Sequence, residues 1–127
     1  MTPKPKILIV DDIAEYAMAF EMYLPDDAEP LRASSAEEAK TLLAGRGAAD
    51  LAIVDVRLDS SREGDTSGME QLSWMRKNYP QMPVIMVSAY QTFEYEIEAL
   101  ERGAFRFLKK PLQPVEVKAA LKEVPLS

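Results

Sequence analysis

Short apolar runs alternate with amphipathic stretches along this chain. Five runs have the length of β-strands, at about residues 6–10, 28–33, 50–55, 84–87 and 104–108. The stretches that follow them place apolar residues at helical spacing, at about residues 13–24, 36–45, 67–79, 92–102 and 114–125. This alternation predicts parallel strands that are joined by helices.

The composition of the runs predicts how the strands are arranged. The runs at 6–10, 50–55 and 84–87 are almost wholly aliphatic, which is typical of strands buried on both faces of a parallel sheet. The run at 28–33 is poor in β-branched residues and is therefore expected at an edge. Right-handed crossovers then favour an α/β fold with a doubly wound, five-stranded parallel sheet in the order 2-1-3-4-5, a flavodoxin-like arrangement with helices on both faces.

Capping signals predict where several helices begin and end. Ser34, Ser35 and Ser67 each precede a glutamate by three residues, so capping boxes are expected at the second and third helices, the latter with Glu70. Gly103 is expected to end the fourth helix because glycine suits the left-handed C-cap conformation.

Polar residues follow four of the apolar runs at the point where each predicted strand ends. Asp11 and Asp12 follow the first run, Asp55 closes the third, Ser88 follows the fourth, and Lys110 follows the fifth. Because parallel strands end at the same edge of a sheet, these residues are expected to share one pocket. Taken singly, Asp12 could be a helix N-cap, and Asp55 or Ser88 could be turn residues. Their common placement favours a joint chemical role.

The turn after the first strand favours a cation over a phosphate group. It contains two carboxylates and no glycine, whereas phosphate-binding turns expose backbone amides. Three carboxylates about 4 Å apart would repel by roughly 4 kcal/mol per pair at an effective dielectric of about 20. A hard divalent ion removes that repulsion, and Mg2+ suits a site with two or three oxygen ligands, with Mn2+ as an alternative. Asp55 beside this ion could attack a phosphoryl group, while Lys110 and Ser88 stabilise the phosphoryl oxygens.

Composition limits the remaining classes of function. The 127 residues fit one domain, 1–127, and no apolar run approaches the length of a membrane span. The chain contains no cysteine, which fits a cytoplasmic location, and its net charge of −6 argues against direct nucleic-acid binding. It also contains no histidine, so a phosphohistidine would have to come from a partner.

The segments KILIVDD, LAIVDVRL, GMEQL, PVIMVSAY and ALERGAFRFLKKPL together make the chain resemble a response-regulator receiver domain of two-component signal transduction. The resemblance implies that Asp55 is the phosphoacceptor, with a histidine kinase or a histidine phosphotransfer protein as the phosphodonor. It implies Mg2+ ligands from Asp11, Asp12, Asp55 and the backbone carbonyl of Arg57. Lys110 matches the family lysine because it directly precedes a proline, whereas Lys109 does not.

The resemblance also assigns switching and tuning residues. Ser88 and Phe107 match the switch pair, while Arg57, Ala89 and Tyr90 match positions that tune the lifetime of the phosphoryl group. Phosphorylation would change the surface formed by the fourth helix, fifth strand and fifth helix. That surface would contact an output domain or downstream protein, and a homodimer formed on phosphorylation is a further partner state. Helical spacing alone equally predicts Ile97 and Leu100 of the fourth helix as core residues.

Two departures from the family pattern and two other functions remain. Asp59 stands where the family usually has proline, and the loop from Asp59 to Ser67 is longer than usual; it is either a tolerated insertion or a segment that shapes partner choice or water access.

The chain could be a receiver-like binding module that works without phosphorylation. A magnesium-dependent phosphatase with an aspartate nucleophile usually needs a second acid two residues after the nucleophile, where this chain has Arg57. The expected protein is therefore not an enzyme beyond its own phosphorylation and dephosphorylation.

Overall fold

The computed structural model describes residues 4–59, 61–89 and 93–124. Tyr90 and Thr92, which were assigned to the tuning site and to the start of the fourth helix, lie outside these described residues. Strands and helices alternate along the chain as β1 Lys6–Val10, α1 Ala14–Glu21, β2 Glu29–Ala33, α2 Ala36–Arg46, β3 Leu51–Asp55, α3 Ser67–Asn78, β4 Val84–Ser88, α4 Phe93–Glu101, β5 Arg106–Lys109 and α5 Pro114–Glu123.

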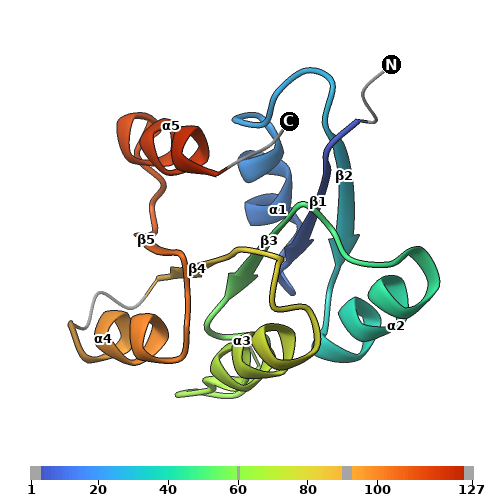
Figure 1. Cartoon of the computed structure of the whole chain (residues 1–127). Coiled ribbons are helices and arrows are strands. Elements are labelled where there is room, and N and C mark those ends of the chain that lie inside the picture. Colours follow the sequence, from blue (N-terminus) through green and yellow to red (C-terminus); the bar gives the residue numbers. More distant parts are fainter. Residues whose placement is uncertain (1–3, 60, 90–92, 125–127) are drawn as a thin grey trace.

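The five strands form one parallel sheet in the order β2-β1-β3-β4-β5, which confirms the predicted topology. Figure 1 shows α1 and α5 on one face of this sheet and α2, α3 and α4 on the other. The direction of the strand order reverses at β1 and β3, so the carboxyl ends of these two central strands flank the point where ligands bind in open α/β sheets.

The core consists of two layers because successive strand residues point to opposite faces. Leu8, Val54 and Met86 belong to the layer that also contains Leu43 of α2 and Leu72 of α3. The intervening strand residues face the other layer, which contains Ala17 and Phe20 of α1 and Val117 and Ala120 of α5, together with Ile7, Ile9, Ile53, Ile85 and Val87. The aliphatic character of β1, β3 and β4 therefore follows from burial on both faces, as predicted.

The predicted capping boxes have different outcomes. Ser35 is the N-cap of α2 and accepts a hydrogen bond from the Glu38 amide, while the Glu38 carboxylate accepts one from the Ser34 amide. The box at Ser67 and Glu70 is wrong. Thr66 occupies the N-cap of α3, and the Ser67 hydroxyl instead donates to Asp65 at 2.6 Å.

The fifth strand begins at Arg106, two residues later than predicted. The Ala104 amide is used by the end of α4, whereas the Phe105 amide already donates to Val84 O of β4. The Gly103 amide donates to Leu100 O and the Ala104 amide donates to Ala99 O, which is the paired pattern of a Schellman cap. Gly103 adopts a φ of 102°, as the C-cap assignment requires.

Two exposure patterns differ from those expected of the helices. The first helix ends at Glu21 rather than continuing to residue 24, and Tyr16, expected on its buried face, is 39% exposed. On α4, Ile97 and Leu100 are 40% and 47% exposed, so their interpretation as core residues is wrong.

In the part of the chain that the structure describes, no helix has the length and apolar character needed to cross a membrane.

Gly68 lies where the start of α3 passes directly over the end of β3. Its amide donates to Val56 O at 2.8 Å, and a Cβ atom at this position would lie 1.9 Å from Asp55 O. This oxygen belongs to the backbone and cannot rotate away, so only glycine fits without moving the strand end or the helix.

We therefore expect Gly68→Ala to lower the free energy of unfolding by about 1–3 kcal/mol, the range typical of overpacking. Gly45→Ala is the matched control, because no atom lies within 4 Å of a Cβ at this position of α2 and alanine favours helix by up to about 1 kcal/mol. Urea unfolding followed by circular dichroism measures both. Equal stabilities of Gly68→Ala and the wild type would show that the close approach is not a constraint.

Candidate functional site

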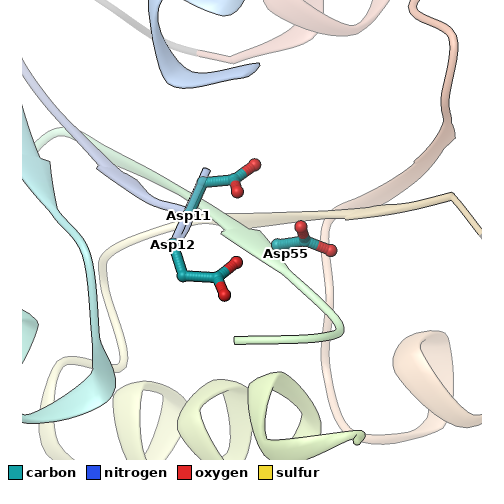
Figure 2. A group of neighbouring side chains, drawn as sticks. All are labelled: Asp11, Asp12 and Asp55. Carbon is teal, nitrogen blue, oxygen red and sulfur yellow. The ribbon is translucent and has the colours of Figure 1, made fainter. Parts of the chain in front are cut away.

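Three aspartates gather at the carboxyl ends of β1 and β3. One carboxylate oxygen from each of Asp11, Asp12 and Asp55 lies within 4.8 Å of the other two. Figure 2 shows the three side chains leaving the neighbouring ends of the two strands toward the same side. Asp11 and Asp55 are buried, and Asp12 is partly buried. The N-cap of α1 is Ile13, whose amide donates to Asp11 at 2.9 Å, so the interpretation of Asp12 as an N-cap is wrong.

Lys110 joins this cluster from the segment that follows β5. Its Nζ atom lies 2.8 Å from Asp55 Oδ2 and 3.0 Å from Asp11 Oδ2, and its side chain is only 6% exposed. The neighbouring Lys109 is exposed, so burial separates the two lysines as the motif comparison did. The Lys110-Pro111 peptide bond is cis, an isomer found almost only at X-Pro bonds.

The environment of Asp55 opposes its negative charge. Burial raises the pKa of Asp55 to about 6, although the Lys110 ammonium lowers it by attraction and hydrogen bonding. The neighbouring Asp11 carboxylate raises this pKa further, and the Arg57 amide, which donates to Asp55 Oδ1 at 3.2 Å, lowers it. The carboxylate thus lies beside the Lys110 ammonium in surroundings that make it easier to protonate than an exposed aspartate.

Tyr16 is a site residue that sequence periodicity missed. The Lys110 Nζ atom lies 3.7 Å from the centroid of the Tyr16 ring, a close cation–π geometry. Asp11, Tyr16, Asp55 and Lys110 also line one small pocket. Helical spacing assigned Tyr16 to the core face of α1. The available signal was its position in the first turns of the helix that starts directly after the acidic pair.

The remaining predicted residues lie around this cluster. Ser88 is fully buried at the end of β4, one residue beyond Val87, which pairs with Asp55 in the sheet. Ala89 is exposed, and Arg57 is partly buried in the segment after β3. Phe107 is half-buried on β5 and packs against the core layer on the α3 side.

The donor set fits a hard divalent cation. All three clustered groups are carboxylates, which Mg2+ and Mn2+ prefer over nitrogen and sulfur ligands. Lys110 lies within hydrogen-bond distance of Asp11 and Asp55, and the burial of these two carboxylates increases the cost of any charge left uncompensated.

Comparisons with known proteins agree with this geometry. Residues 7–122 match the family model of the response regulator receiver domain. The chain is 37% identical over 110 residues to the response regulator protein PilR of Pseudomonas aeruginosa, covering 86% of this chain and 23% of PilR. It is 34% identical over 116 residues to the alginate biosynthesis transcriptional regulatory protein AlgB of Pseudomonas putida, covering 91% of this chain and 25% of AlgB. The chain therefore spans about a quarter of the length of these relatives.

Solved structures show the same fold. A response regulator from Thermotoga maritima superposes with a TM-score of 0.82 at 26% identity, covering 98% of this chain and 99% of that one. A CheY-like response regulator receiver domain protein from Methanospirillum hungatei superposes with a TM-score of 0.79 at 29% identity, covering 94% and 92% of the two chains. The family match, the relatives and the shared fold lead to one conclusion: this chain belongs to the response regulator receiver domain family.

Proposed function

We propose that this receiver domain, spanning residues 1–127, accepts a phosphoryl group on Asp55. The observation that carries the proposal is the convergence of Lys110 with Asp11 and Asp55, all buried, at the edge where the central strands end. A structural role alone would not require two carboxylates to be buried around one ammonium, since such clusters contribute little to stability. The phosphodonor is a phosphohistidine on a histidine kinase or a histidine phosphotransfer protein, because the chain has no histidine of its own.

In this reaction an Asp55 carboxylate oxygen attacks phosphorus. A phosphorus–oxygen bond forms, the phosphorus–nitrogen bond to the donor imidazole breaks, and the electron pair of that bond stays on the imidazole nitrogen. The Lys110 ammonium stabilises one phosphoryl oxygen by electrostatic attraction, and the Ser88 hydroxyl donates a hydrogen bond to another. Asp11, Asp12, Asp55 and the Arg57 carbonyl hold Mg2+, or Mn2+ in its place, which when bound neutralises charge on the transferred group. The domain thus catalyses only its own phosphorylation and, with water as the nucleophile, its dephosphorylation.

The output is a change in population between two conformations. The phosphoryl group favours the conformation in which Ser88 moves toward it and Phe107 turns inward, and it shifts the equilibrium only by its differential affinity for the two states. The affected surface consists of α4, β5 and α5, where Phe93 is 72% exposed beside the exposed Ile97 and Leu100. We propose this surface as the contact for an output domain, a downstream protein or a second copy in a phosphorylated homodimer.

Three further residues, Arg57, Ala89 and Tyr90, tune the lifetime of the phosphoryl group.

The other two functions have less support. A phosphorylation-independent binding module would not need a buried lysine within hydrogen-bond distance of two carboxylates. A magnesium-dependent phosphatase would need an acid where Arg57 stands.

The first test is phosphorylation by a small-molecule phosphodonor, followed by intact-protein mass spectrometry. We expect the wild type to gain one phosphoryl group in the presence of Mg2+ and none in its absence, because the ion offsets charge that Lys110 alone cannot. Asp55→Asn should gain none under either condition, while Asp26→Asn, at an exposed turn, should behave like the wild type. An unphosphorylated but folded wild type would instead favour the binding module.

The contact between Lys110 and Tyr16 gives a second test. Replacing the ring by Tyr16→Leu removes a cation–π interaction of about 1 kcal/mol, so we expect about fivefold slower phosphorylation at saturating Mg2+. Tyr16→Phe keeps the ring face and should retain most of the rate. If Tyr16→Phe is as slow as Tyr16→Leu, the hydroxyl rather than the ring face is responsible.

The raised pKa of Asp55 predicts a pH-dependent stability in the absence of divalent ions. Between its ordinary value of 3.8 and about 6, folded Asp55 binds a proton that the unfolded chain has lost, so its contribution to stability falls as pH rises through this window. Since one pKa unit corresponds to about 1.4 kcal/mol, the full effect is about 3 kcal/mol.

Urea unfolding in EDTA should therefore show Asp55→Asn gaining stability relative to the wild type between pH 4 and pH 7. Addition of Mg2+ at pH 7 should reduce the gap by stabilising the wild type. Parallel pH profiles of the two proteins would contradict the assigned environment of Asp55.

A further inference from the structure

The loop between β3 and α3 is organised around one carboxylate oxygen. Asp65 Oδ2 accepts hydrogen bonds from the Leu58 amide at 3.1 Å, the Asp59 amide at 3.1 Å and the Ser67 amide at 3.3 Å. The Ser67 hydroxyl donates to the same oxygen at 2.6 Å. One side chain thereby ties the segment that leaves β3 to the first residue of α3.

These hydrogen bonds favour the charged carboxylate. Burial raises the pKa of Asp65, but the hydrogen bonds from Ser67, Asp59 and Leu58 outweigh it and hold this pKa below its ordinary value. Hydrogen bonds to an ionised acceptor are about twice as strong as those between neutral groups. An asparagine at this position would lose the charge and would add an amide group with no place among four donors.

A short chain of contacts leads from Asp65 to the phosphoacceptor. Residues 58 and 59 are held by Asp65, and the Asp59 carbonyl accepts a hydrogen bond from Arg57 Nε at 3.3 Å. The Arg57 amide donates to Asp55 Oδ1 at 3.2 Å. On the other side of the loop, the close approach of Gly68 to Asp55 O fixes α3 against the strand end. Arg57 is therefore held between two anchored points.

We propose that Asp65 is a positioning residue for the metal step, holding the Arg57 backbone so that its amide orients Asp55 and its carbonyl faces the cation. This inference rests on the proposed function, because it assumes that the aspartate cluster binds Mg2+. In this proposal the long Asp59–Ser67 loop sets the affinity for Mg2+ and is more than a tolerated insertion. Asp65 contacts neither metal nor phosphate and acts through Arg57.

Asp65→Asn tests this role, and Glu63→Gln is the matched control. Both substitutions remove one negative charge from the same loop, but Glu63 is exposed and takes part in none of the hydrogen bonds around Asp65. Mg2+ binding measured by isothermal titration calorimetry is independent of phosphorylation. We expect Asp65→Asn to raise the Mg2+ dissociation constant about tenfold, the lower end of the effects seen when a partner of a metal ligand is removed. Glu63→Gln should stay within about twofold of the wild type, since it changes only a screened surface charge.

The Mg2+ dependence of phosphorylation should separate positioning from chemistry. Asp65→Asn should need more Mg2+ for its half-maximal rate but approach the wild-type rate at saturation, whereas a purely structural role would lower stability and leave the Mg2+ dependence unchanged. If Asp65→Asn does not fold, Ser67→Ala removes only the 2.6 Å bond and should give a smaller rise in the dissociation constant. Unchanged Mg2+ affinity in the folded variants overturns the role of Asp65. A wild type that binds no Mg2+ overturns the proposed function as well, so the two failures are distinguishable.

Discussion

One ammonium group shared by two buried carboxylates constrains the rest of this structure. Lys110 reaches Asp11 across 99 residues of sequence and Asp55 across 55 residues. Each charge would cost several kcal/mol to bury alone, so the three groups can be buried only together. They meet only if β1 and β3 end at the same edge of the sheet and β5 delivers its following turn to that edge. The parallel topology and the buried cluster of Lys110, Asp11 and Asp55 are therefore two consequences of the same arrangement.

The remaining charge imbalance connects this constraint to chemistry. Lys110 offsets one negative charge of a cluster that contains three carboxylates. Burial raises the pKa of Asp55 to about 6, so a proton or a second cation relieves the excess. A proton would block attack on phosphorus because it occupies the nucleophilic oxygen, whereas a divalent ion leaves a lone pair available. The environment that destabilises ionised Asp55 is therefore one that a bound divalent cation would stabilise.

The sequence predicted the parts of the site that strand ends determine. Asp11, Asp55 and Lys110 come together because parallel topology brings the ends of β1, β3 and β5 to one edge of the sheet. The continuously aliphatic, buried runs of β1 and β3 are a strong sequence signal for that topology. Tyr16 was assigned to the core because helical spacing shows which face a residue occupies but not whether that face ends beside a charge. The box predicted at Ser67 failed because the Asp65 carboxylate, two residues earlier, competes for the same hydroxyl and amide.

The contrast between strand ends and loop explains where this chain departs from its family pattern. Strand register admits few alternatives, since a shift of β3 by one residue would turn Asp55 away from Lys110 and the other aspartates. The loop after Leu58 has no such register and must obtain its geometry from side chains, here from four hydrogen bonds to one oxygen of Asp65. Its conformation can therefore change with a single residue while the sheet stays the same. Because Arg57 lies between this loop and Asp55, variation in the loop can alter the position of Arg57 without altering the aspartates of the cluster.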